Sequence, residues 1–252
     1  HMKSLEYYLK KAKFLEGKTI SEVLPKYKPE YSENRRITKS VFANFIEKDY
    51  FGEPLSNHSN PDFQDVNLEL KTSGIKFVKT RNIYRAKERL VISQVNYHEI
   101  ALHKNWIYNP SLKKMFKMLI VLYFYENKPK KFEDFQIIHT FIWEPSDKEV
   151  DKIQNDYTII RDKVLKGEAN SEGDNEFFST TTKHTGKYNK DNPSKSTKSS
   201  LSSHPYLEFA KKRGFCIKQK AFDRIIADSL KKNLKNVKNS LGLLKEDYPN
   251  FK

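Results

Sequence analysis

Apolar and polar side chains alternate along residues 66–71, and this pattern predicts a strand. The apolar positions are Val66, Leu68 and Leu70. A period of two is typical of a strand with one buried face. The polar side chains of Glu69 and Lys71 are therefore expected to point the same way.

Apolar residues at helical spacing predict helices in three other places, and each helix runs up to a glycine. They cover residues 5–16, 39–51 and 146–167. In the third, Ser146 and Glu149 have the spacing of a capping box, in which each side chain satisfies an amide at the start of the helix.

Runs rich in β-branched and aromatic residues predict further strands. They cover residues 89–95, 117–125 and 135–143. Residues 214–222 predict another strand, with Lys218 and Lys220 on one face, followed by a helix from Asp223 to about Val237. This mixture of helices and strands predicts an α/β protein.

Residues 171–204 differ in character, because they are rich in Ser, Thr, Lys and Asn. Their one large apolar pair is Phe177 and Phe178. Such a segment cannot bury enough surface to fold by itself, so a long mobile basic loop is expected. The loop could order on DNA, or it could be a solvated linker. Its lysines include Lys183, Lys187, Lys190, Lys195 and Lys198.

Asp62 adds a second carboxylate to the strand that carries Glu69 and Lys71. Residues 56–61 are turn-forming, which lets Asp62 approach the polar face of that strand. Mg²⁺ characteristically binds through one or two carboxylates, its own waters and a substrate phosphate. Asp62 and Glu69 are therefore candidate Mg²⁺ ligands, with Lys71 beside them to orient the attacking water. The alternative is an ordinary exposed strand face.

The charge of the chain favours the metal-site interpretation over the ordinary strand face. There are 47 Lys and Arg against 32 Asp and Glu, so the formal net charge is +15 and the pI is about 9.5. Such a chain attracts polyanions, and nucleic acid is the simplest partner. A membrane is not expected, because the apolar run from Met118 to Tyr125 is too short to span one.

Cysteine content and the start of the chain suggest an intracellular, cytoplasmic protein. Cys216 is the single cysteine, which excludes an internal disulfide, and no cationic leader with an apolar core is visible. His1 and Met2 look like a cloning remnant. Residues 3–245 are expected to form a single domain.

Other catalytic chemistries have weaker support. The histidines are scattered, and no Cys-x-x-Cys or His-x-x-x-His motif is present, which disfavours a zinc site. With 8 glycines and no Gly-x-x-x-x-Gly-Lys motif, an ATP-binding loop is not expected.

The sequence around Asp62 and Glu69 resembles a known family. The motif Asp62-Phe63-x4-Leu68-Glu69-Leu70-Lys71-Thr72 resembles the active-site strand of MutH and of the Sau-type restriction endonucleases that cleave GATC. Further similarity lies in residues 87–97, in Thr181 to Gly186 and in residues 205–222, so that about residues 35–230 are covered. The amino-terminal catalytic domain of the Sau-type enzymes is the most similar part.

The resemblance implies a PD-(D/E)xK fold, with a central mixed β-sheet flanked by helices, and Mg²⁺-dependent cutting of double-stranded DNA at GATC, 5′ of the G. Asp62 and Glu69 match the metal ligands, and Lys71 matches the catalytic lysine. Glu47 matches a helical glutamate of the family, although Ala43 replaces the family's glycine. Lys87 matches a basic residue near the scissile phosphate, and Arg89 competes with it for that role.

Several basic residues are candidate DNA contacts. Lysine can donate to guanine O6 and N7 in the major groove. The candidates for base reading are Lys183, His184, Lys218 and Lys220, and the wider DNA-contact set adds Arg89 and Lys187.

Sau-type enzymes are about twice as long as this chain and carry a second, non-catalytic copy of the fold that activates cleavage. The resemblance therefore implies that a second domain or copy acts with this chain, which would be a monomer or a transient dimer on DNA and would nick first. Three alternatives stay open: a MutH-like mismatch-repair nickase, a non-catalytic DNA-binding effector module and a basic RNA-binding protein.

Overall fold

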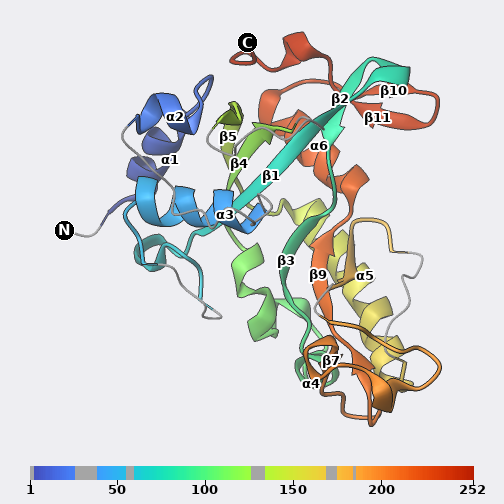
Figure 1. The fold of residues 1–252 in the computed structure, drawn as a ribbon. Helices are drawn as coiled ribbons and strands as arrows, with labels where there is room; N and C mark the ends of the chain where they lie inside the picture. The colour runs from blue at the N-terminus through green and yellow to red at the C-terminus, as the bar shows by residue number, and fades with distance from the viewer. Residues whose placement is uncertain (1–2, 26–38, 55–59, 126–133, 169–174, 184–185) are drawn as a thin grey trace. The chain divides into compact units, whose positions relative to one another are not determined.

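A computed structural model describes residues 3–25, 39–54, 60–125, 134–168, 175–183 and 186–252 (Figure 1). The chain forms two compact units. The first unit contains His1–Glu88, Lys117–Glu144 and Asp223–Lys252, and the second unit contains Arg89–Phe116 and Pro145–Phe222. The chain therefore passes between the units several times, and each unit is described by itself below.

The first unit is built on a mixed sheet with the strand order β2-β1-β4-β5. Strand β1 pairs parallel with β4 and antiparallel with β2, and β4 pairs antiparallel with β5 (Figure 1). These strands are β1 (Glu69–Val78), β2 (Ile83–Ala86), β4 (Met118–Phe124) and β5 (Ile137–Trp143). The strands predicted at residues 117–125 and 135–143 are confirmed, and β2 was not predicted.

Strand β4 occupies the interior of this sheet. All its residues except Phe124 are buried, as expected for a continuous apolar run flanked by strands on both sides. Aromatic and aliphatic side chains from the helices of the first unit form a core with β1, β4 and β5 that includes Phe42, Phe45, Leu119 and Tyr123. This core fixes the position of the β1 strand from which Glu69 and Lys71 extend.

Short helices accompany this sheet. They are α1 (Leu5–Lys13), α2 (Ile20–Val23), α3 (Lys39–Asn44) and the π-helix η1 (Phe45–Tyr50). The first two predicted helices are confirmed, with earlier ends than expected and a π-helical second half in residues 39–51. The glycines that follow them, Gly17 and Gly52, have φ values of 78° and 76°. Glycine reaches this left-handed region without the penalty that a Cβ atom imposes.

The carboxy-terminal part differs from the prediction. Helix α6 (Gln219–Leu230) begins earlier and ends earlier than expected. A hairpin of β10 (Lys235–Val237) and β11 (Ser240–Gly242) follows, and its turn residues Lys238 and Asn239 have φ values of 47° and 62°. Lys231 also has a positive φ of 55°, which stops the helix before the expected end at Val237.

The second unit contains an antiparallel sheet with the strand order β3-β9-β6. Its strands are β3 (Leu90–Gln94), β9 (Arg213–Ile217) and β6 (Phe178–Thr182). Strand β3 confirms the strand predicted at residues 89–95. The unit also contains α4 (Tyr97–Leu102), the 3-10 helices η4 (Trp106–Tyr108) and η5 (Pro110–Met115), and the small pair β7 (Leu201–Ser202) and β8 (Ala210–Lys211).

Helix α5 (Asp147–Leu165) packs against β6 in this unit. Its predicted capping box is confirmed, since the Ser146 amide and hydroxyl donate to Glu149 at 2.8 and 2.9 Å. Four apolar residues at helical spacing along it are buried: Ile153, Tyr157, Ile160 and Val164.

The expectation of a loop throughout residues 171–204 is wrong where β6 lies. Phe177 and Phe178 are buried, and β6 pairs along its length with β9. The buried carboxylate of Asp156 on α5 accepts hydrogen bonds from the amides of Glu176, Phe177 and Phe178 at 2.9, 2.7 and 2.7 Å. These bonds fix the start of the strand, and their source lies outside the segment. The mobility expected of the loop stays a prediction, as does the single domain at residues 3–245.

None of the helices in the described parts of the chain combines the length and the apolar character needed to cross a bilayer.

Glu16 links three segments of the first unit. Its carboxylate accepts hydrogen bonds from the Thr140 amide at 2.6 Å and from Asn250 Nδ2 at 2.8 Å, and it lies 3.3 Å from His139 Nδ1. Lys13 Nζ lies 2.8 Å from it. Burial raises the pKa of Glu16, but the hydrogen bonds from His139, Lys13 and Thr140 outweigh burial and lower the pKa to about 2.

This pKa predicts how stability depends on pH. Because the folded-state pKa lies below the ordinary value of 4.5, ionised Glu16 contributes stability above pH 4.5 that is lost as the pH falls towards about 2. The free energy of unfolding of the wild type should exceed that of Glu16→Gln at neutral pH, and the difference should shrink across this range. Urea unfolding at several pH values measures it.

Glu6→Gln is the matched control, because Glu6 is an exposed carboxylate on neighbouring α1. A difference between the wild type and Glu16→Gln that stays constant down to acidic pH would contradict the assigned role of Glu16.

Candidate active site

The approach to β1 is a tight loop. Phe63 and Leu68 form an isolated antiparallel bridge, with reciprocal backbone hydrogen bonds of 2.9 and 3.1 Å. Between them lies the 3-10 helix η2 (Gln64–Val66), and Asn67 then takes the left-handed conformation with φ 50° and ψ 45°. The strand predicted from Val66 therefore begins only at Glu69. The short polar side chain of asparagine tolerates this backbone better than most residues do.

The loop brings Asp62 back to the beginning of β1. Its Oδ2 atom accepts a hydrogen bond of 2.9 Å from the Leu70 amide. Asp62 therefore lies at the backbone of this strand, while its approach to the face that carries Glu69 and Lys71 stays a prediction. A carboxylate that accepts a backbone hydrogen bond is held in one orientation, which is a requirement for a preorganised ligand.

Glu69 and Lys71 project to the same side of β1, as predicted from their spacing. Glu69 Oε1 and Lys71 Nζ lie 2.7 Å apart. The alternative of an ordinary exposed strand face is wrong, since Glu69 is only 2% exposed and Lys71 is half-buried. A buried carboxylate is costly unless it is paired, so the ammonium group of Lys71 stabilises this arrangement.

Glu47 lies on the π-helix η1 and is 9% exposed. Single π-helical turns are frequent at functional sites. Among the residues that the structure describes, no group of three His, Cys, Asp or Glu side chains is placed to hold a metal ion. Glu47 therefore stays a predicted member of the site. Mg²⁺ needs only one or two carboxylates, and the oxygen donors Asp62 and Glu69 are of the kind it prefers.

Lys87 and Arg89 fall in different units. The Lys87 amide donates to the carbonyl of Gly74 on β1 at 2.8 Å, and its Nζ atom lies 3.8 Å from the centroid of the Tyr125 ring. Arg89 opens the part of the second unit that leads into β3 and is half-buried. Lys87 thus belongs to the same unit as the carboxylates.

The other predicted DNA contacts lie in the second unit. Lys183 directly follows β6 and Lys187 is exposed, whereas His184 falls outside the described residues. Lys218 and Lys220 do not share a strand face, because Lys220 is on helix α6. The ammonium group of Lys218 donates to the carbonyl of Asn175.

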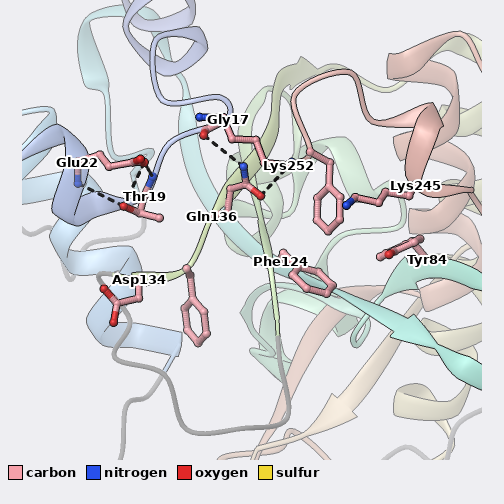
Figure 2. A pocket seen from close by; sticks show the side chains of 11 residues that line it. Gly17, Thr19, Glu22, Tyr84, Phe124, Asp134, Gln136, Lys245 and Lys252 are labelled. Atoms are coloured by element: carbon pink, nitrogen blue, oxygen red, sulfur yellow. Dashed lines mark hydrogen bonds between the residues drawn. The ribbon is translucent and has the colours of Figure 1, made fainter.

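A pocket of about 470 Å³ lies in the first unit, away from the predicted site residues (Figure 2). Several of its polar groups bond to one another. The side chain of Gln136 donates to the Gly17 carbonyl at 3.2 Å and accepts from the Lys252 amide at 3.3 Å. Lys245 lies over the ring of Phe251, with Nζ 4.9 Å from the centroid. The pocket contains none of the predicted catalytic carboxylates.

Sequence reasoning missed two buried charged residues that organise the units. Arg213 bonds Thr180 across the β9 and β6 pair, with 2.8 Å from Nε to Oγ1. Asp223 accepts the Ala86 amide at 2.7 Å and pairs with Arg85 at 3.1 Å, and burial raises its pKa to about 6. Arg213 and Asp223 are each distant in sequence from their partners, so no local sequence pattern predicts these interactions.

Two comparisons show which known proteins this chain is similar to in sequence. Residues 51–156 match the family model of the DNA mismatch repair enzyme MutH. This segment contains Asp62, Glu69 and Lys71 but not Glu47.

The chain is also similar to one particular enzyme. It is 29% identical over 228 residues to the type II restriction enzyme Sau3AI of Staphylococcus aureus, which covers 85% of this chain and 42% of that enzyme. The chain thus spans less than half the length of this curated relative. The resemblance to MutH and the Sau-type enzymes is confirmed.

Proposed function

We propose that this chain is a Mg²⁺-dependent endonuclease that hydrolyses double-stranded DNA at GATC, 5′ of the G, as a type II restriction endonuclease or its catalytic part. One observation carries the proposal. Asp62 accepts a hydrogen bond from the Leu70 amide at the start of β1, where Glu69 Oε1 and Lys71 Nζ lie 2.7 Å apart. These residues lie within the segment that matches the MutH family model. The mixed sheet flanked by helices agrees with a PD-(D/E)xK fold.

The residues at and around the start of β1 have distinct roles in this proposal. Asp62 and Glu69 would hold Mg²⁺, which when bound supplies Lewis-acid stabilisation of phosphate charge and a more acidic water. Lys71 orients the attacking water and neutralises charge that develops on the phosphate oxygens. Glu47 completes the acidic side of the site, and Lys87 contacts the phosphate from the same unit.

DNA binding depends on the basic residues of the second unit. The net charge of +15 favours association with a polyanion, and phosphate contacts position the protein while base contacts give specificity. The proposed contacts are Arg89, Lys183, His184, Lys187, Lys218 and Lys220.

One active site cuts one strand, so this chain acts as a monomer or a transient dimer and nicks before it cuts both strands. A second allosteric domain or copy supports full cleavage. The proposed location is the cytoplasm, where the enzyme meets DNA.

The match to MutH also favours a second candidate, a mismatch-repair nickase that cuts the unmethylated strand of hemimethylated GATC. Hemimethylated and unmethylated duplexes, with and without added MutL, distinguish it from a restriction enzyme.

A non-catalytic effector module would lack one of Asp62, Glu69 and Lys71, and all three are present. A basic RNA-binding protein would prefer structured RNA and leave plasmid DNA uncut in Mg²⁺.

Substitution of Asp62 and of Lys71 tests the catalytic assignment. Asp62→Asn and Lys71→Gln should lower the rate of plasmid cutting in Mg²⁺ by at least about 100-fold, because each removes a group that stabilises the transition state. DNA binding, measured by fluorescence anisotropy, should persist. Melting temperatures identify any variant that fails to fold, since Glu69 loses its ammonium partner in Lys71→Gln.

Asp65→Asn and Lys76→Gln are matched controls in the same loop and on the same strand. They should cut like the wild type. A folded Asp62→Asn or Lys71→Gln protein with unchanged turnover would refute the assigned roles.

The phosphate contacts predict a particular dependence on salt. Lys187 and Lys220 are exposed, so each should neutralise a phosphate. For Lys220, this phosphate contact takes the place of the base contact expected from the sequence. Replacement of either by Ala should make the slope of log K against log salt shallower by about 0.9. Lys10→Ala, on α1 of the first unit, should leave the slope unchanged. Equal slopes in all four proteins would remove Lys187 and Lys220 from the contact set.

A further inference from the structure

Among the proposed DNA contacts, Lys183 has a side chain that lies against the sheet of the second unit. It follows β6 directly, its amide donates to the Lys212 carbonyl at 3.3 Å, and its side chain is half-buried. In contrast, Lys187 and Lys220 are exposed. A side chain that is already held by its surroundings loses less freedom on binding, which suits a contact that must select a base.

The backbone beneath Lys183 is that of Gly214 on β9. A Cβ atom built at Gly214 would lie 3.2 Å from Lys183 Cε, 3.2 Å from the Ser93 carbonyl oxygen and 3.4 Å from Val91 Cγ1. The Lys183 side chain therefore folds back across β9 at the one position of that strand that has no side chain. Any other residue at Gly214 would bring its Cβ atom into tight contact with the Lys183 side chain, which would have to shift by a few tenths of an ångström.

The register that brings Lys183 to Gly214 is fixed from both ends of β6. At the start, Asp156 binds three successive amides at 2.7 to 2.9 Å. Near the end, Arg213 donates to the Thr180 hydroxyl at 2.8 Å and to its carbonyl at 3.2 Å, while Thr181 pairs with Gly214. Lys183 thus leaves a strand whose register is specified by buried polar bonds, which are costly to break.

We propose that Gly214 is a positioning residue for DNA recognition, because its bare backbone holds the Lys183 ammonium group in the orientation that reads a base. The inference rests on the proposed function and names Lys183 as the contact that determines specificity within it. Gly214 itself touches no DNA and acts through Lys183.

A methyl group at Gly214 would meet two neighbours at the same distance of 3.2 Å, Lys183 Cε and the Ser93 carbonyl oxygen. Lys183 Cε is the far end of a flexible side chain and can shift by a few tenths of an ångström, whereas the Ser93 carbonyl belongs to a strand paired with β9, so that contact costs stability. Gly214→Ala should therefore shift Lys183 and change DNA discrimination in the same direction as the loss of Lys183, with a lower melting temperature.

A double-mutant cycle tests the coupling. The readout is the ratio of kcat/KM on the preferred site to kcat/KM on a site with one changed base pair. Lys183→Ala should lower this ratio by about 5- to 100-fold, which corresponds to one lost base contact. Gly214→Ala should lower it in the same direction, and adding Gly214→Ala to Lys183→Ala should lower it no further.

Cys216→Ala is the matched control, because Cys216 lies on the same face of β9 and is buried. It should lower the melting temperature and keep the discrimination ratio of the wild type. Independent, additive effects of Gly214→Ala and Lys183→Ala on the ratio would overturn the proposal, as would a ratio in Gly214→Ala equal to that of the wild type.

A second readout needs no DNA, so it separates this inference from the proposed function. Limited acetylation followed by peptide mass spectrometry measures how accessible each lysine is. Lys183 should react several-fold faster in folded Gly214→Ala than in the wild type, while Lys187 and Lys220 react equally in both. Unchanged reactivity of Lys183 would overturn the positioning role even in an active nuclease. If wild-type protein cuts no DNA yet Lys183 shows the expected change, the proposed function fails and the positioning of Lys183 by Gly214 holds.

Discussion

The parallel pairing of β1 with β4 is the constraint on which the candidate active site depends. It runs from Glu69 opposite Met118 to Ile75 opposite Phe124, and β4 is almost entirely buried. Because β2 and β5 close the sheet on either side, β1 cannot shift along its neighbours without breaking paired hydrogen bonds and the core below them. Glu69 and Lys71 are therefore held at a fixed place. The loop that ends at Asn67 then brings the second carboxylate to the strand, where Asp62 accepts a hydrogen bond from the Leu70 amide.

The two units divide the proposed work. The first unit carries the carboxylates, Lys71 and Lys87, and the second unit carries Arg89 and the lysines proposed to bind DNA. Each unit has its own sheet. In each unit, a buried carboxylate accepts hydrogen bonds from backbone amides: Asp223 in the first unit and Asp156 in the second. Buried carboxylates in such positions define the local register more strictly than apolar packing does, because an unsatisfied partner is costly.

Much of this arrangement could be predicted from the sequence, and the exceptions have physical causes. The long apolar run of β4, the capping box of helix α5 and the spacing of Glu69 and Lys71 are all visible in the local sequence. Strand β6 could not be found in this way, since Phe178 is its only strongly apolar residue and its anchor, Asp156, lies on another element. The start of β1 was misplaced because an alternating pattern continues through a loop that Asn67 turns. The alternative of an exposed face at Glu69 stays open in the sequence alone, because burial depends on segments distant in sequence that the local pattern does not show.

The most direct test of the account is to incubate the folded protein with plasmid DNA in Mg²⁺ or in EDTA and to sequence the ends that form. The account predicts nicks and breaks 5′ of the G in GATC in the Mg²⁺ sample and intact plasmid in EDTA. Plasmid that stays intact in Mg²⁺, or cutting that is equal in both samples, would contradict the claim that Asp62, Glu69 and Lys71 form a metal-dependent nuclease site.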